Sequence, residues 1–240
     1  MASDMQSWSR ANEVQRAPVG VDVGLRQYML RVYNYMGGGL ALTGLVAYFG
    51  ATSGLYASVA GTPLFWIVLL APLALVFLLN FRIERMSLGA ARLSFWVSAA
   101  LVGLSLSGIF LVYTGVSIAR VFFISAATFG ATSLYGYTTR SDLSRFGSFL
   151  FMGLIGVVIA GLANIFLASS ALQFTISVIG VLVFAGLAAY DTQRISTIYI
   201  GDEDEAASGK KAIIGALALY LDFLNLFLML VQLFGEDKRR

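Results

Sequence analysis

Two acidic residues stand inside long apolar segments of this sequence. Asp191 lies late in the segment that begins near Ala171, Asp222 lies near the middle of segment 212–234, and the other eleven of the 13 acidic residues lie in tails or loops. An ionised carboxylate at the centre of a membrane span costs about 2.5–3.5 kcal/mol on insertion scales, so we read both residues as functional. Two carboxyl groups in contact in a low-dielectric site share one proton, and its loss leaves like charges that push the helices apart or bring in a cation. The pair predicts a pH-gated pore or a cation site.

The two carboxyl groups are expected at similar depth. Asp222 follows Lys211 by 11 residues, which is about 16 Å of helix. If the preceding segment stays helical to Ile200, Asp191 lies nine residues from the same loop, or about 13 Å. Both helices enter from that loop, so the side chains can face each other.

Several polar residues are candidate partners of this pair. Arg194 follows Asp191 by one helical turn, and a local ion pair between them is the alternative explanation of Asp191. Arg82 or Arg85, on the same side of the membrane, could supply a counter-charge. Asn225 lies one turn after Asp222 and extends the polar face.

The composition is that of an integral membrane protein. Hydrophobic residues make up 58% of the 240 residues and charged residues only 12%, whereas about a quarter of a soluble domain is charged. Cysteine and histidine are absent, which excludes disulfides, thiolate metal sites and imidazole chemistry. The acidic run 202–205 lacks the spacing of an EF-hand loop and is predicted to be a solvated linker. We expect no bound cofactor and no nucleic-acid partner.

Seven hydrophobic segments predict an all-α, seven-transmembrane-helix bundle, because only helices or closed barrels satisfy the backbone in lipid and no segment alternates like a barrel strand. They would form one domain over residues 34–235, followed by a basic tail at 236–240. Residues 1–33 form a cytoplasmic tail, and residues 21–36 are either an interfacial helix or an extension of the first span. The segments are 34–51, 62–81, 88–113, 117–137, 146–167, one beginning near 171, and 212–234.

The basic residues orient this bundle. Lysine and arginine concentrate in the N-terminal tail and in the loops after the second, fourth and sixth segments, which predicts a cytoplasmic N-terminus. Seven crossings would place the C-terminus outside, although residues 238–240 are basic and favour the inside. We favour a full crossing by the last segment because it has spanning length.

Sequence motifs in the last two segments resemble the Bax inhibitor-1 (transmembrane Bax inhibitor motif) family, and its bacterial members most. They are AAYDTQRI, which contains Tyr190, Asp191 and Gln193, and LALYLDFLNLFLMLVQLFG at 217–235. The segment GIFLVYTGVSIARVFFISAATFGATSLYGYTT at 108–139 extends the likeness.

The resemblance implies a seven-helix bundle with the last helix at its centre. It also implies a pH-sensitive Ca²⁺ leak in a bacterial inner membrane, with lipid, Ca²⁺ and H⁺ as partners and Ca²⁺ as the permeant ion. The family's two sensor aspartates fall on Asp191 and Asp222, which become the candidate Ca²⁺ site. An arginine at the end of the second helix joins them in the family's closed state, and Arg82 and Arg85 are the candidates.

Two other function classes are weighed against the channel. An intramembrane aspartyl protease would use Tyr190 and Asp191, but Asp222 has no Gly-x-Gly before it and no Pro-Ala-Leu follows, since the last proline is Pro72. We therefore expect no enzyme. A non-transporting membrane protein that regulates or binds other membrane components stays open as the alternative.

Overall fold

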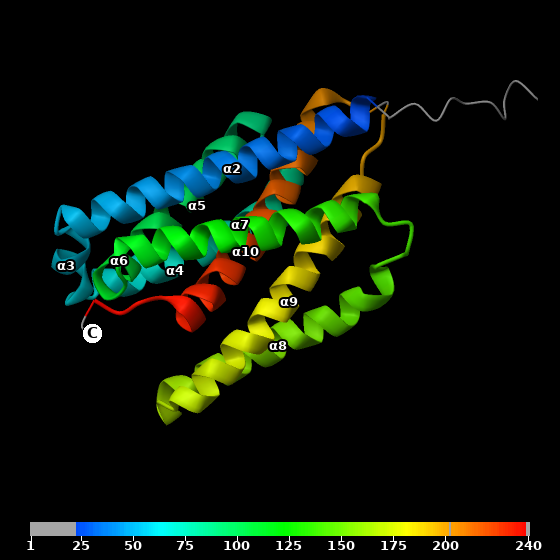
Figure 1. Cartoon of the computed structure of the whole chain (residues 1–240). Coiled ribbons are helices and arrows are strands. Elements are labelled where there is room, and N and C mark those ends of the chain that lie inside the picture. Colours follow the sequence, from blue (N-terminus) through cyan, green and yellow to red (C-terminus); the bar gives the residue numbers. More distant parts are fainter. Residues whose placement is uncertain (1–22, 202, 239–240) are drawn as a thin grey trace, which may run out of the picture.

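The computed structural model describes residues 23–201 and 203–238, and this part of the chain is helical throughout, with no β-strand (Figure 1). The all-α class predicted from the sequence is confirmed. The elements are α2 (Val23–Thr52), α3 (Leu55–Ala60), α4 (Leu64–Arg82), the 3₁₀ turn η1 (Ile83–Arg85), α5 (Leu88–Leu106), α6 (Ile109–Val112), α7 (Gly115–Thr138), α8 (Ser144–Leu167), α9 (Ser170–Thr197) and α10 (Glu205–Phe234).

Six of these helical stretches are long and apolar enough to cross a membrane. They are α4 with η1, α5 with α6, α7, α8, α9 and α10. With its 30 residues α2 has ample length, but it is more polar than these six and is not among them. The structure therefore supports a multi-pass membrane protein with six spanning helices, and the predicted count of seven is not confirmed.

The first described helix is continuous across the predicted domain boundary. Because α2 begins at Val23, residues 23–36 are one helix with residues 37–52 and form an extension of that helix. The rest of the predicted N-terminal tail, residues 1–22, lies outside the described residues. Gly54, with a φ of +75°, then turns the chain into the short helix α3, which the sequence patterns did not indicate.

Capping side chains set where several helices begin. The hydroxyl oxygens of Ser87, Thr114 and Ser169 accept backbone N–H groups at the starts of α5, α7 and α9. Asp204 caps α10 by accepting the Ala206 N–H at 3.2 Å. A capping carboxylate also suits the positive end of the helix dipole. This cap explains why α10 begins seven residues before the predicted start.

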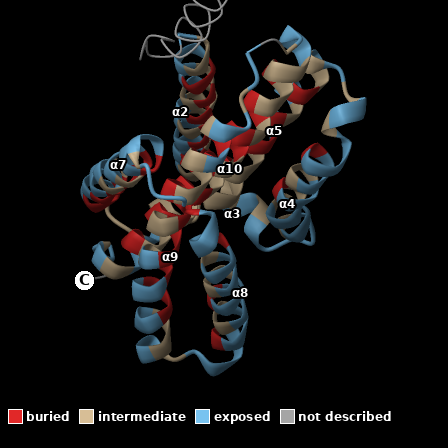
Figure 2. Ribbon diagram, turned by 90° about the vertical axis from the view of Figure 1, so that its right-hand side faces the viewer, coloured by how far each residue is buried: buried red, intermediate tan, exposed pale blue. Residues whose placement is uncertain are grey.

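The last described helix lies at the centre of the bundle. Of the most apolar window of α10, 67% is buried, against 39% or less in the other five spanning helices. Figure 2 shows this buried surface where α2, α5, α7 and α9 surround α10. Tyr220 of α10 is fully buried and bonds to the Thr43 hydroxyl of α2 at 2.7 Å. The Thr43 hydroxyl itself donates to the Ala99 carbonyl of α5 at 2.9 Å.

Contacts hold the segments before and after α10 at opposite ends of the bundle. At one end, the rings of Tyr28 of α2 and Tyr199 of the α9–α10 loop lie 5.4 Å apart. At the other end, the residues after α10 pack on the turn between α6 and α7: the Thr114 N–H donates to the Glu236 carbonyl at 2.9 Å, and Arg120 pairs with the Glu236 carboxylate at 2.9 Å. Residues 235–238 therefore lie at the opposite end of the bundle from the α9–α10 loop, and a full membrane crossing by the last segment stays a prediction.

Candidate functional site

The seam between α9 and α10 is an antiparallel contact of small and polar residues. Near one end, a Cβ added to Gly215 would lie 3.0 Å from the Ile195 side chain, so the two backbones approach closely there. Near the other end, the Ser177 hydroxyl donates to Gln232 Oε1 at 2.9 Å. Small residues permit such close packing of membrane helices. The seam therefore brings small and polar side chains of the two helices together.

Asp191 of α9 and Asp222 of α10 come together in this seam. Their carboxyl groups interact directly. Asp222 is only 6% exposed, and in the part of the chain that the structure describes its Oδ2 atom is buried without a hydrogen-bond partner. An unsatisfied buried acceptor is costly, and an unpaired buried charge is more so. A proton shared by the two carboxyl groups, or a cation between them, would remove this cost.

Arg194 is a second neighbour of Asp191. Its Nη1 atom lies 3.9 Å from Asp191 Oδ1, and its side chain is 62% exposed. An ion pair so long and so exposed contributes little, about 0–1 kcal/mol. The two explanations of Asp191 weighed from the sequence thus coexist, because its carboxylate contacts both Asp222 and Arg194.

The other predicted partners lie elsewhere. Arg82 ends α4 and Arg85 ends η1, both are exposed, and among the described ion pairs none joins them to an aspartate. The Asn225 amide donates to the Leu221 carbonyl of its own helix at 2.8 Å. A latch through either arginine stays a prediction.

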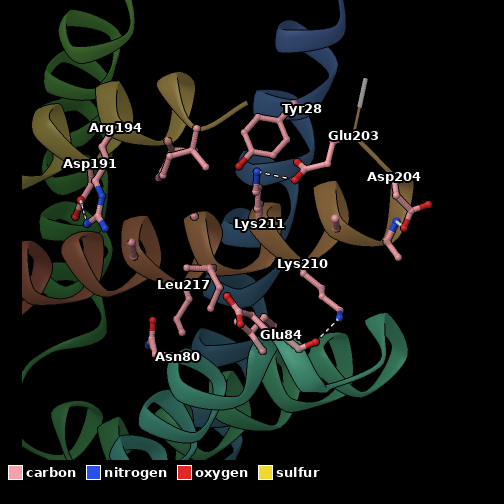
Figure 3. Close-up of a pocket in the computed structure, with 18 of the residues that line it drawn as sticks. Tyr28, Asn80, Glu84, Asp191, Arg194, Glu203, Asp204, Lys210, Lys211 and Leu217 are labelled. Carbon is pink, nitrogen blue, oxygen red and sulfur yellow. Dashed lines mark hydrogen bonds and ion pairs between the residues drawn. The ribbon is translucent and has the colours of Figure 1, made fainter. Parts of the chain in front are cut away.

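A cavity of about 730 Å³ leads from the α9–α10 loop to Asp191 (Figure 3). It lies between α4, α9 and α10, and Asp191 and Leu221 are its deepest lining residues counted along α9 and α10. Asp222 does not line it and lies one residue beyond Leu221. The carboxyl pair therefore sits at the inner end of a space that begins at the loop.

Charged groups at the mouth of this cavity are held in pairs. Lys211 lies 2.7 Å from the Glu203 carboxylate, and the Lys210 ammonium donates to the Glu84 carbonyl at 3.1 Å (Figure 3). The Glu203 side chain is only 21% exposed. The expectation that residues 202–205 form a solvated linker is therefore wrong for Glu203, which is mostly buried and tied to α10. Asp204 is exposed as expected, but it caps α10, and Glu205 is the first residue of that helix.

Comparison with known proteins gives the family. The family described as "Inhibitor of apoptosis-promoting Bax1" matches residues 25–239. The chain belongs to the Bax inhibitor-1 family. It is 48% identical over 219 residues to the inner membrane protein YbhL of Escherichia coli K12, covering 90% of this chain and 94% of that protein. It is 43% identical over 246 residues to an uncharacterized protein of Caulobacter vibrioides, covering 97% and 98%. An uncharacterized protein of Rickettsia prowazekii is 48% identical over 218 residues, covering 90% and 92%.

The carboxyl pair of this Bax inhibitor-1 protein offers few oxygen donors to a metal ion. In the described ranges no three His, Cys, Asp or Glu side chains are grouped to hold a metal ion. Two carboxylates supply at most four oxygens, whereas Ca²⁺ takes six to eight. The pair is better suited to a proton, or to a cation that keeps part of its water, than to a permanently bound ion.

Sequence reasoning missed residues that build the approach to the pair. Asn80 and Glu84, near the end of α4, line the cavity although the nearby Arg82 and Arg85 do not. Tyr28 of α2 and Glu203 line its mouth. Asn80 was detectable, since an amide near the end of an apolar helix signals a polar environment, but the position of Glu203 depends on how the loop folds back.

Proposed function

We propose that this membrane protein is a pH-regulated cation leak channel, with Ca²⁺ as a permeant ion and Asp191 and Asp222 as its gate. The observation that carries the proposal is the pair itself: two carboxyl groups meet in a helix seam at the inner end of a cavity. One of their oxygens is buried without a partner in the described structure. Such an arrangement is unstable as two charges and stable with one proton.

The gating follows from the charge on the pair. With one proton, the carboxyl groups can share a hydrogen bond that holds α9 against α10. Without it, two like charges about 4 Å apart repel by about 4 kcal/mol at an effective dielectric constant of about 20. That repulsion would shift the closed-to-open ratio by about a thousandfold. Acid therefore closes the channel and alkali opens it.

The proposed orientation places the cavity mouth in the cytoplasm of a bacterial inner membrane. The α7–α8 loop contacts the end of α9 through Gln193, and Lys210 at the start of α10 contacts η1. The basic residues of these three regions therefore lie at the end that carries the cavity mouth, as expected for the cytoplasmic side. We propose that α2 also crosses, as the seventh span, which brings the N-terminus to the same side. A cation would then pass Glu203 and Asn80 before it reaches Asp191.

Calcium flux from liposomes tests this function. Purified protein in vesicles loaded with a calcium dye should leak more at pH 8 than at pH 6, and Asp222→Asn and Asp191→Asn should each flatten this pH response. Asp142→Asn is the matched control, since Asp142 lies in the α7–α8 loop, outside the spanning helices. Absence of flux by the wild type, or a normal pH response in both membrane variants, would refute the proposal.

The same preparation tests the competing functions. A silent wild type would favour a non-transporting regulatory protein. Cleavage of an added transmembrane peptide, lost in Asp222→Asn and Asp191→Asn, would identify an aspartyl protease.

A further inference from the structure

A groove separates α2 from α7 along one side of the bundle. Both helices pack against α10, and between them lies a space of about 520 Å³ with Phe223 of α10 among its lining residues. Figure 1 shows α2 and α7 running alongside each other, and the Tyr33 and Ser133 hydroxyls bridge them at 2.6 Å. The groove lies on the outside of a membrane bundle, where lipid is the surrounding solvent.

Three hydroxyl groups that join α2, α7 and α9 are satisfied within the protein. The Thr192 hydroxyl donates to the Ala188 carbonyl at 2.7 Å. Ser133 therefore donates to Thr192 at 2.8 Å, and Tyr33 donates to Ser133. Each hydrogen of these three hydroxyl groups has an acceptor within the protein. This part of the groove wall therefore suits an apolar occupant.

The length of the groove matches one leaflet of a bilayer. Its lining runs on α2 from Arg26 to Leu40, 14 residues or about 21 Å. A bilayer with its headgroups is about 40–45 Å thick, so half of it is about 20–22 Å. A lipid with its headgroup beside Arg26 would extend its acyl chain to about Leu40.

The charge at the groove entrance selects the headgroup. Arg26 lines the groove and is exposed, and no described carboxylate pairs with it. Arg140 follows α7 at the same end of the bundle. Basic pockets between membrane helices bind anionic lipid headgroups. We propose that the α2–α7 groove is a binding site for an anionic phospholipid, with its phosphate on Arg26 and an acyl chain between the two helices.

Two glycines allow the groove to be filled without disturbing the fold. A Cβ on Gly37 of α2 or on Gly130 of α7 would meet no atom within 4 Å, and both glycines line the groove. Leucine at these positions occupies the space where the acyl chain would lie. Gly156 of α8 is equally open and lines none of the described cavities, so Gly156→Leu is the matched control.

Native mass spectrometry measures how much lipid the protein binds in detergent. Dioleoyl phosphatidylglycerol or dioleoyl phosphatidylcholine is added to the protein. The wild-type protein should bind phosphatidylglycerol about fivefold more tightly than phosphatidylcholine. This ratio corresponds to about 1 kcal/mol for one basic residue at a membrane surface. Arg26→Gln should abolish this preference, whereas Arg31→Gln, on another face of α2, should keep it. Gly37→Leu with Gly130→Leu should lower binding of both lipids, and Gly156→Leu should not.

Three results would overturn the proposal. The first is equal binding of the two lipids by the wild type, and the second is unchanged lipid occupancy in the double leucine variant. The third is a dimer that this variant dissociates, because a second copy of the chain would then occupy the groove. The binding measurement is independent of ion flux.

Discussion

The bond between Thr43 and Tyr220 predicts that two small substitutions have unequal costs. Tyr220→Phe removes one hydrogen bond but leaves the Thr43 hydroxyl donating to the Ala99 carbonyl. Its cost should be about 0.6–1 kcal/mol, in the range for hydrogen bonds between membrane helices. Thr43→Val instead leaves the hydroxyl of Tyr220, a residue only 1% exposed, without its acceptor. An orphaned buried donor costs about 1–3 kcal/mol.

Thermal unfolding of the purified protein measures this difference. Near this size, 1 kcal/mol lowers the Tm by about 2–4 °C, so Tyr220→Phe should lose about 1–4 °C and Thr43→Val about 2–12 °C. The double variant should be no less stable than Thr43→Val, because the orphaned hydroxyl is gone. Thr132→Val is the control, since its hydroxyl bonds only within α7. The reasoning fails if Thr43→Val costs no more than Tyr220→Phe, or if the two losses simply add.

Three further measurements test other contacts. Gly136→Ala should strongly destabilise the protein, because its Cβ would overlap the Ala189 backbone carbonyl, whereas Gly156→Ala has open space; thermal unfolding compares the two. Arg120→Gln should change stability by less than about 1 kcal/mol, since both side chains of its ion pair with Glu236 are more than half exposed, and a loss of several kcal/mol would contradict this. Hydrogen bonds from the side chain and backbone of Ser144 lower the pKa of Asp142, so their contribution to stability is present above the ordinary aspartate pKa and is lost as the pH falls through the lowered value. The Ser144 amide resonance should follow that titration by NMR, and a midpoint above the ordinary value would contradict it.

The sequence was sufficient to predict the long apolar helices and the two acidic residues that meet between the last two of them. Hydropathy located the six apolar spans because each must satisfy its backbone internally in lipid. The positions of Asp191 and Asp222 in two apolar segments that enter from one loop indicated that their side chains meet. These features depend on local periodicity, which a single sequence contains.

The distances of the two aspartates from the ends of their helices could not be predicted, because they depend on where the helices end and how the loop between them folds. Because α9 ends at Thr197, Asp191 lies only six residues from the end of its helix, or about 9 Å, less than expected. Asp222 lies 17 residues into α10, or about 26 Å. The cap at Asp204 marks the start of α10 and so the second distance, and this cap arises from the fold of the loop.

The central position of α10 has a consequence for biogenesis. The chain is synthesised from its N-terminus, yet the most buried helix follows all the others that the structure describes. The bundle therefore lacks its central helix until the four helices that surround it, α2, α5, α7 and α9, have been made. Both membrane aspartates lie on the last two described helices, so Asp222 is synthesised only 31 residues after Asp191. The protein thus assembles its two acids as a pair, and neither needs to cross the bilayer long before the other.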